Sequence, residues 1–135
     1  MAAVGAFSGL RFCAEEHALA LPVETSGWKI AAPQTCMKPV PPAMKVWRGT
    51  AGARSVFTAD YAGSPPMKLT IYYMPSEFAS AFDAEQKWSP QPGKRSFFKG
   101  SYFGVVEGDG ADRLVLERFV GAIEAALPAG SEWHH

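Results

Sequence analysis

The segment Lys68–Trp88 contains the clearest change of hydrophobic periodicity in the chain. Along its first half, apolar and polar side chains alternate, which predicts a strand with one buried face. Pro75 has no N–H group to donate to a sheet, so we expect the strand to end before it. Ser76 then predicts a helix N-cap, and Phe78 and Phe82 are spaced to lie on one face of a helix that covers the strand.

A second helical pattern occupies the end of the chain. Carboxylates in the turn Gly108–Asp112 precede it, and Pro128 and Gly130 terminate it. Between these limits the apolar residues are separated by three and four positions; they are Leu116, Phe119, Val120, Ile123 and Leu127. This spacing predicts an amphipathic helix of about 16 residues.

Shorter alternating runs predict the remaining strands, at residues 27–30, 45–49, 55–61, 95–99 and 102–107. The loop 62–66 is expected to return the chain antiparallel into 67–74, and Gly100-Ser101 to form the turn of a later hairpin. Both faces of Tyr102–Val106 carry apolar side chains, which indicates a strand in the middle of the sheet.

The sequence before residue 44 predicts less regular structure. Within the N-terminal segment 1–20, helical spacing over 8–20 predicts a short helix, which ends at Leu21-Pro22. Residues 33–43 contain four prolines and are expected to form an extended loop.

Strands joined by short turns, with two late helices, predict an α+β fold. We expect an antiparallel β-sheet of about five strands, packed with an N-terminal short helix, a middle helix and a long C-terminal helix. The 135 residues fit a single domain, 1–135. The tail 131–135 is compatible with part of a purification tag, so its histidines are left out of the search for sites.

Charge and the length of apolar runs narrow the classes of function. Lys plus Arg and Asp plus Glu both number 13, and the basic residues are scattered rather than gathered into a stripe. We therefore expect no nucleic-acid binding. No apolar run approaches the roughly 20 residues of a membrane-spanning helix, so no transmembrane segment is predicted. The start, Met1–Cys13, has two open interpretations, the clipped end of a signal peptide or an ordinary terminus.

The two cysteines, Cys13 and Cys36, also leave two alternatives open. In an exported protein, a disulfide between them would add about 2–4 kcal/mol of stability. In a reducing cytosol both would be ordinary thiols. Neither lies in a Cys-x-x-Cys pattern, so the sequence predicts no redox or zinc role for them.

The sequence shows no pattern for catalysis or metal binding. Glu15, Glu16 and His17 are of ligand type, but adjacent helical residues diverge by about 100 degrees and do not converge on one ion. Nucleophile, phosphate-loop and metalloprotease motifs are absent. Asp60 falls on the polar side of a strand pattern, where we predict no catalytic role. We therefore expect no catalytic residue, no metal site and no cofactor.

Aromatic residues on or beside the strands are the best candidates for binding. Among them, Trp47, Tyr61 and Tyr72 are the candidate ligand-binding residues. Tyr72 is on the opposite face of its strand from Leu69 and Ile71, so it lies either under a second helix layer or at the surface. Two interpretations stay open, packing in the core and an exposed strip that binds a ligand or a partner protein.

Several short motifs resemble a family of exported bacterial domains of unknown function. They are Gly27-Trp28, Tyr61-Ala62-Gly63, Leu69-Thr70-Ile71-Tyr72-Tyr73, Ala79-Ser80-Ala81-Phe82 and Gly100-Ser101-Tyr102-Phe103, followed by the final helix. The order of elements is also similar to that of PsbP-like domains, in which helices cover an antiparallel sheet. The resemblance spans about residues 20–128 and implies this fold and an exported location. It supplies no catalytic residues, and the proline-rich segment with Cys36 departs from the family pattern.

The sequence therefore favours a small non-enzymatic exported module that binds a partner protein or a small ligand through an aromatic-rich sheet face. Two other functions stay open, a small enzyme or cofactor carrier with a dispersed site, and a structural subunit of an envelope or extracellular assembly. A cytoplasmic location also stays open. A deep polar pocket with Asp60 or His17 would favour the enzyme, whereas an exposed apolar patch with Trp47 and Tyr72 would favour partner binding.

Overall fold

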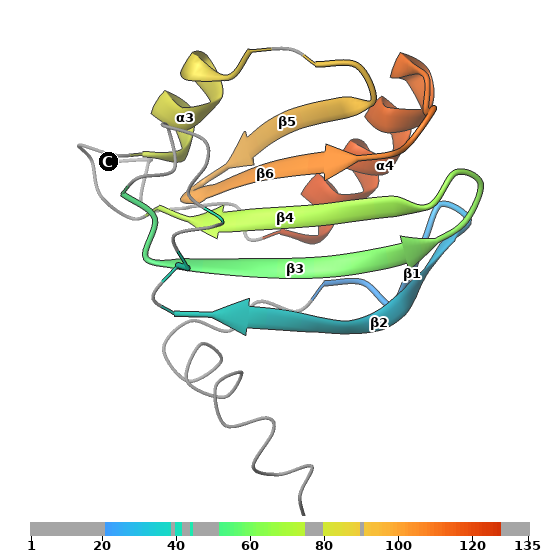
Figure 1. Ribbon diagram of the computed structural model, residues 1–135, viewed down its shortest axis with the longest axis horizontal. Helices are drawn as coiled ribbons and strands as arrows, with labels where there is room; N and C mark the ends of the chain where they lie inside the picture. The colour runs from blue at the N-terminus through green and yellow to red at the C-terminus, as the bar shows by residue number, and fades with distance from the viewer. Residues whose placement is uncertain are drawn as a thin grey trace, which may run out of the picture.

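The structure is a computed structural model that describes residues 21–38, 40–41, 44, 52–74, 80–89 and 91–127. These residues form a six-stranded antiparallel sheet with one helix on each side (Figure 1). The elements in chain order are β1 (Glu24–Thr25), β2 (Trp28–Met37), β3 (Ser55–Ala62), β4 (Met67–Tyr73), α3 (Ala81–Lys87), β5 (Lys94–Lys99), β6 (Tyr102–Glu107) and α4 (Arg113–Ala126). The expected α+β class with an antiparallel sheet is confirmed, and the described residues contain six strands where about five were expected.

The strands follow the order β1-β2-β3-β4-β6-β5 across the sheet, and all neighbours are antiparallel. The first four strands form a meander. The chain then leaves β4 through α3, forms the edge strand β5 and returns as β6 between β4 and β5 (Figure 1). Apolar residues on both faces of β6 are buried, which confirms the predicted central strand.

Two tight turns set the register of the hairpins. Ser26 and Gly27 join β1 to β2, and their positive φ values of 49° and 91° suit a two-residue type I′ turn. β1, which the sequence did not predict, is only Glu24–Thr25 and therefore too short to show a period. The predicted turn at Gly100-Ser101 is confirmed between β5 and β6, with φ of 59° at Gly100.

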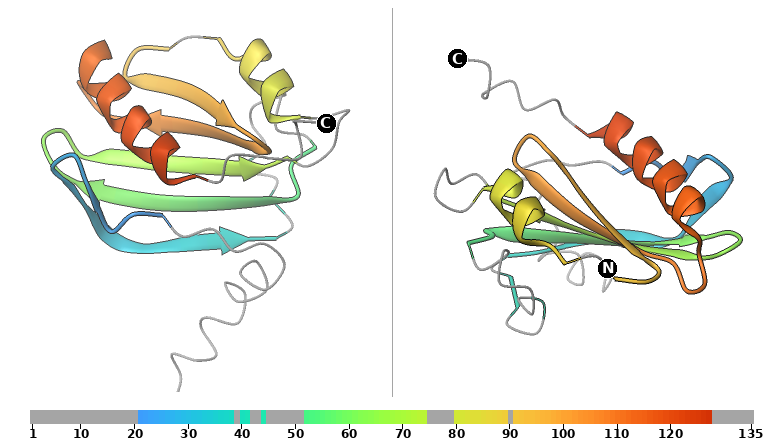
Figure 2. Two further views of the ribbon diagram at one scale, coloured as in Figure 1. Left: turned by 180° about the vertical axis from the view of Figure 1, so that it is seen from behind. Right: turned by 90° about the horizontal axis from the view of Figure 1, so that it is seen from above.

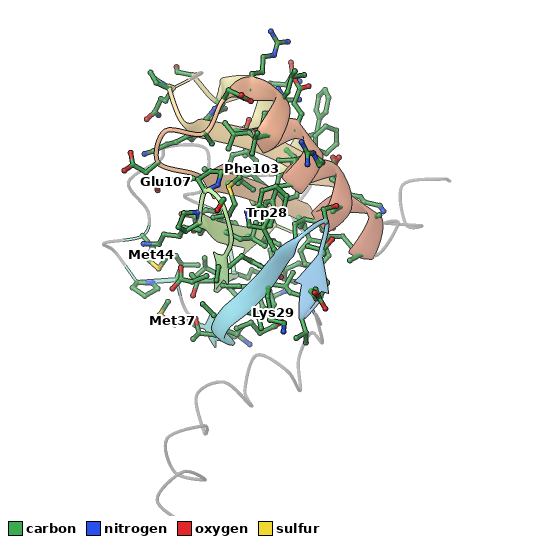
Figure 3. All side chains as sticks on the ribbon, turned by 90° about the vertical axis from the view of Figure 1, so that its right-hand side faces the viewer. Trp28, Lys29, Met37, Met44, Phe103 and Glu107 are labelled. Atoms are coloured by element: carbon green, nitrogen blue, oxygen red, sulfur yellow. The ribbon has the colours of Figure 1, made fainter. Side chains whose placement is uncertain are left out.

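The helix α4 packs across one face of the sheet (Figure 2). All five apolar residues of its predicted stripe are buried there: Leu116, Phe119, Val120, Ile123 and Leu127. Phe119 lies at the centre, where its ring makes edge contacts with Trp28 at 5.2 Å and with Tyr61 at 5.1 Å between ring centroids. Figure 3 shows Trp28 on the side of α4, and Met44 and Glu107 on the opposite face.

Both ends of α4 are satisfied by side chains. At the start, a carboxylate oxygen of Asp112 accepts the N–H of Val115 at 2.9 Å, the geometry of an N-cap. At the end, the ammonium of Lys99 on β5 donates to the carbonyl of Glu124 at 2.6 Å. A cation at this position also opposes the negative end of the helix dipole. The helix has 14 residues, close to the predicted length of about 16.

The helix α3 covers only one end of the other face. Its buried side contributes to a second cluster that contains Val40, Val56, Tyr72, Met74, Ala81, Ala84 and Phe103. Seen from above in Figure 2, α3 and α4 lie on opposite sides of the β5–β6 hairpin. Tyr72 therefore lies under a second helix layer, which confirms one of the two alternatives for this residue.

The start of α3 differs from the prediction. Ser80 is its N-cap, and the Ser80 hydroxyl accepts the N–H of Asp83 at 3.1 Å. The predicted cap Ser76 and its neighbour Phe78 lie outside the described residues. Phe82 was expected to cover the strand, but it is 51% exposed, because Ala81 and Ala84 occupy the buried side of the helix.

The proline-rich segment is less irregular than expected. β2 extends from Trp28 to Met37, so the predicted loop 33–43 was wrong for residues 33–37. Two register shifts against β3, on either side of Ala32, accompany Pro33. β1 pairs only with the first two residues of β2, so Pro33 lies on an edge stretch where a strand tolerates proline.

Other predicted features lie outside the described residues. They are the helix 8–20 with Cys13, Glu15, Glu16 and His17, the strand 45–49 with Trp47, and the tail 131–135. In the part of the chain that the structure describes, no helix has the length and apolar character needed to cross a membrane.

Candidate functional site

Beside the cluster under α3, the second face carries two rows of side chains across the strands. The first row pairs three half-buried threonines, Thr35, Thr58 and Thr70, with Val105 and the buried Ser96. Within it, the hydroxyls of Thr35 and Thr58 are hydrogen-bonded to each other. The next row toward the β3–β4 hairpin consists of Asp60, Lys68, Glu107 and Lys94, on β3, β4, β6 and β5. The charges of this charged row alternate in sign.

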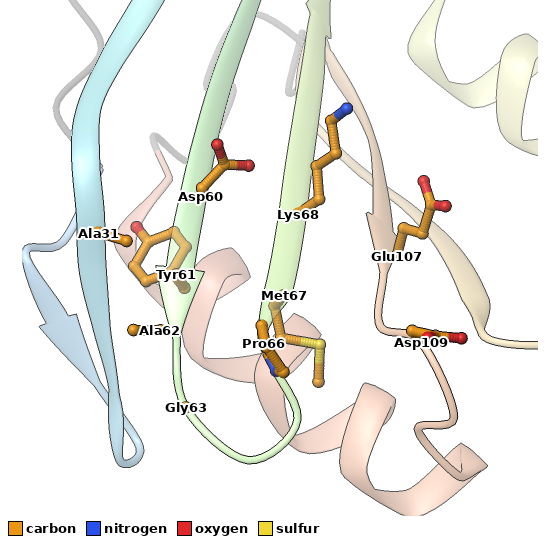
Figure 4. A pocket seen from close by; sticks show the side chains of 10 residues that line it. All are labelled: Ala31, Asp60, Tyr61, Ala62, Gly63, Pro66, Met67, Lys68, Glu107 and Asp109. Atoms are coloured by element: carbon orange, nitrogen blue, oxygen red, sulfur yellow. The ribbon is translucent and has the colours of Figure 1, made fainter.

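A groove of about 500 Å³ opens beside the charged row. Its lining residues come from β2, β3, β4 and the end of β6; they are Ala31, Asp60, Tyr61, Ala62, Gly63, Pro66, Met67, Lys68, Glu107 and Asp109. In Figure 4, Asp60, Lys68 and Glu107 project side by side from three adjacent strands. The volume falls within the roughly 300–1,000 Å³ of sites that bind small molecules.

Packing of the β3–β4 loop fixes one wall of the groove. The indole N–H of Trp28 donates to the carbonyl of Pro65 at 2.7 Å. At Gly63 an added Cβ would overlap the Trp28 indole, so only glycine lets the loop approach this closely. The loop that carries Pro66 into the groove is therefore anchored to the core beneath α4.

A second turn holds the carboxylates at the other side. The N–H of Gly108 donates to the carbonyl of Gly93 at 2.8 Å. A Cβ at Gly108 would lie 2.7 Å from the sulfur of Met67, so any larger residue would force the buried Met67 side chain to shift. The position of Gly108 in turn places its two neighbours, Glu107 and Asp109, at the groove.

Carboxylates outnumber ammonium groups in the lining. Asp60, Glu107 and Asp109 face a single cation, Lys68. Within the described part of the chain, none of these four side chains forms a salt bridge or hydrogen bond. Their charged ends are therefore available to a ligand.

Tyr61 lines the groove but is not equipped to transfer protons at neutral pH. Its side chain is 1% exposed, and its hydroxyl donates to the carbonyl of Pro22 at 2.7 Å. Burial raises the pKa of Tyr61 to about 12, so the phenol is neutral. Its ring packs in the core under α4, and Met67, the other large buried residue of the lining, belongs to the same core.

The lining has carboxylates but no Ser, Thr, Cys or His. It therefore lacks the residue types of a Ser, Thr or Cys nucleophile with a His base. Among the residues that the structure describes, no group of three or more His, Cys, Asp or Glu side chains is placed to hold a metal ion.

The predicted ligand-binding residues do not come together. Tyr61 belongs to the core under α4 and Tyr72 to the cluster under α3, so the two rings lie on opposite faces. The Tyr72 hydroxyl donates to the carbonyl of Met44 at 2.7 Å, and burial raises the pKa of Tyr72. An exposed aromatic strip containing both tyrosines is therefore not formed, and Trp47 lies outside the described residues.

Asp60 is exposed on the polar side of β3, as the alternation predicted, and it lines the groove. Sequence reasoning did not identify Lys68, Glu107 or Asp109 as site residues. The loop 62–66 already implied the pairing of Asp60 with Lys68 across the hairpin. Glu107 lies beside Lys68 because β4 pairs with β6. This pairing could not be read from the sequence, because α3 and β5 separate the two strands along the chain.

Exposed aromatic side chains occur elsewhere in the fold. Phe82 on α3 and Phe98 on β5 are 51% and 36% exposed, with their rings 5.4 Å apart in an edge contact. This pair lies beside the edge strand, away from the groove residues.

Cys36 is buried on the α4 side of β2 and is not a free thiol. Its candidate partner Cys13 lies outside the described residues, so the Cys13–Cys36 bridge stays a prediction.

Comparison of the chain with protein-family models, with curated proteins and with solved structures finds no match. The resemblance to exported PsbP-like domains therefore stays a prediction.

Proposed function

We propose that this protein is a small ligand-binding module and that its binding site is the groove at the β3–β4 hairpin. The observation that carries the proposal is a recess of about 500 Å³ that combines a fixed apolar wall with charged groups left unpaired among the described residues. A preformed wall lowers the entropy cost of binding, and a few charged groups orient the ligand. The site takes the place of the aromatic sheet face that the sequence favoured.

Binding is favoured over catalysis by the arrangement of the polar groups. Asp60, Lys68 and Glu107 lie in one row across three adjacent strands, with cross-strand neighbours of opposite sign. This order suits recognition of a complementary charge pattern.

The proposal is tested by filling the groove. Ala62 is exposed and lines the groove, so Ala62→Phe adds a ring to the recess without entering the core. Ligand-observed NMR with a fragment library of anionic, cationic, zwitterionic and neutral compounds should detect binders of the wild type. These binders should be lost in Ala62→Phe.

The matched control is Ala126→Phe, which adds the same ring to an exposed position at the end of α4. This variant should retain every binder. Binding that survives in Ala62→Phe, or that is lost equally in the control, would place the site elsewhere and contradict the proposal. Circular dichroism of both variants verifies that the sheet is intact.

We also propose that the protein is exported and carries a Cys13–Cys36 disulfide. The support is that Cys36 is buried and not a free thiol, because disulfides persist in oxidising compartments. Under denaturing conditions without reductant, iodoacetamide should leave the intact mass unchanged. After reduction, both cysteines should be alkylated. Alkylation of both before reduction would rule out the bridge.

A further inference from the structure

The charged row is asymmetric around the groove. Glu107 has a lysine on each side, Lys68 on β4 and Lys94 on β5. Asp60 has only one cationic neighbour, Lys68, and on its other side it pairs with Ala32 of β2. The carboxylate of Asp60 therefore has an open side that faces the groove, where Ala31 and Ala62 are small.

The spacing of this row sets the size of the complementary ligand. Neighbouring strands lie about 4.8 Å apart, so the charged ends of Asp60 and Lys68 start from backbones at that separation. Hydrogen bonds between charged groups are about 2.7–2.9 Å long. A ligand that carries its own cation and anion on the same or adjacent carbon atoms is therefore able to contact both ends.

The remaining lining supplies room for an apolar substituent. Ala62 and Pro66, both exposed, form the wall on the hairpin side of the charged row. The loop before Pro66 is tied to Trp28, so this wall is present before a ligand arrives. An aliphatic side chain placed against it would remove apolar surface from water on both partners.

From these three features we infer that the groove binds a small zwitterion, of the class of an α-amino acid with an aliphatic side chain. The inference rests on the proposed function of the groove and adds the chemical class of its ligand. The ligand ammonium donates to Asp60, the ligand carboxylate accepts from Lys68, and the side chain lies against Ala62 and Pro66.

Simpler ligands match the groove less well. A simple anion would meet Lys68 but also three carboxylates, Asp60, Glu107 and Asp109. A simple amine would satisfy Asp60 and leave Lys68 without a counter-charge from the ligand. Because carboxylates are in excess, the ammonium is the stronger of the two anchors.

The inference is tested with three matched probes: L-leucine, isoamylamine, which lacks the carboxylate, and isocaproate, which lacks the ammonium. Each is titrated into the wild-type protein and followed by the amide shifts of residues 60–68 and 107–109. Leucine should bind about tenfold or more tightly than isoamylamine, and isocaproate most weakly. Leucine that binds no more tightly than isoamylamine would overturn the zwitterion assignment.

Two variants that each remove one charge test the contact to the ligand carboxylate and the contact to the ligand ammonium separately. Lys68→Gln should reduce leucine affinity to that of isoamylamine, while leaving isoamylamine unchanged. Asp60→Asn should weaken leucine and isoamylamine alike. Arg118→Gln, on the exposed surface of α4, is the control and should bind all three probes as the wild type does.

The outcomes distinguish the inference from the function on which it rests. If none of the three probes shifts the groove amides while Ala62→Phe still abolishes binding of other fragments, the zwitterion assignment fails and the ligand-binding function stands. If Ala62→Phe abolishes no binding, the proposed function fails. Equal leucine affinity in Lys68→Gln and wild type would contradict the role of Lys68.

Discussion

The two faces of the sheet differ in how they are covered. On one face, α4 buries side chains from every strand of the sheet except the two-residue β1. At the centre of this face, the ring of Phe119 contacts the rings of Trp28 and Tyr61. On the other, α3, Val40 and Met44 pack beside the row that contains Tyr72, and Val105 of the next row packs against the same cluster. Asp60, Lys68 and Glu107 of the charged row remain exposed there.

The two faces should therefore contribute unequally to stability. Burial of apolar area is the main favourable contribution to folding, so the α4 face should carry most of the stability. The charged row contributes little to burial, so under the proposed function its side chains are available for binding. The same strands carry both faces because successive side chains point to opposite sides of the sheet.

The largest expected effect is at the centre of the α4 face. Phe119→Ala should lower the free energy of unfolding by about 3–5 kcal/mol, because it removes a fully buried ring and leaves a cavity. Urea denaturation followed by circular dichroism measures this loss. The control is Leu114→Ala on the same helix, at a side chain 74% exposed, where we expect a change within about 0.5 kcal/mol. Similar losses at both positions would mean that α4 is not docked as described.

A smaller loss is expected where the sheet itself is tightly packed on this face. A Cβ at Gly104 on β6 would overlap the ring of Phe97 on β5, so Gly104→Ala should destabilise the fold by about 1–3 kcal/mol. Gly121→Ala on α4 should instead stabilise the fold, since nothing lies within 4 Å of a Cβ at that position. There the better helix propensity of alanine should raise stability by about 0.5–1 kcal/mol. If the denaturation midpoints of Gly104→Ala and Gly121→Ala shift in the same direction, the close packing of Phe97 on Gly104 is contradicted.

Tyr61 and Tyr72 are buried on opposite faces and each donates one hydrogen bond to a backbone carbonyl, so the same substitution at both compares the stability of the two faces. Tyr61→Phe and Tyr72→Phe each remove one hydrogen bond to a carbonyl, and each should cost about 1 kcal/mol at neutral pH.

The pH dependence of stability adds a second test. Burial raises the pKa of Tyr61 to about 12, whereas an unfolded tyrosine ionises near 10. The unfolded chain therefore loses this proton first, and the free energy of unfolding should fall as the pH rises above about 10. Tyr61→Phe should make this fall less steep. Parallel curves for the wild type and the variant would show that Tyr61 ionises equally in both states.

The smallest effect is expected on the uncovered side. Glu107→Gln replaces a charge on an exposed residue of the charged row, so the free energy of unfolding should change by no more than about 0.5 kcal/mol. Chemical denaturation of this variant beside Phe119→Ala compares the two faces directly. A loss of several kcal/mol at Glu107 would mean that the uncovered face also holds the fold together.

The fold could be predicted where one pattern dominates a segment. The stripe from Leu116 to Leu127 predicted α4, and the apolar residues on both faces of Tyr102–Glu107 predicted the central strand. The loop at 33–37 was mispredicted because a proline was taken as the end of strand structure, whereas Pro33 lies on an edge stretch with shifted register. α3 was misplaced because its buried side consists of alanines, which are weaker signals of burial than Phe82.

The candidate site could not be predicted from local patterns. Asp60, Lys68 and Glu107 each occupy an ordinary polar position of a strand, and nothing within a single strand marks them as a group. Their proximity arises from the sheet order, in which β4 pairs with β6 rather than with the next strand in the sequence. Tyr61 and Tyr72, which were predicted to bind ligand, are instead held by hydrogen bonds to backbone carbonyls within the two cores.

The insertion of β6 between β4 and β5 has a consequence for synthesis of the chain on the ribosome. β1 to β4 pair with neighbours that have already emerged, so this meander is able to form from its N-terminal end. Among the described strands β5 pairs with β6 alone, so it emerges before its partner Tyr102–Glu107 has been translated. A nascent chain that stops at Lys99 therefore exposes the open edge of β4, and the last strand is the one that commits the growing polypeptide to this sheet.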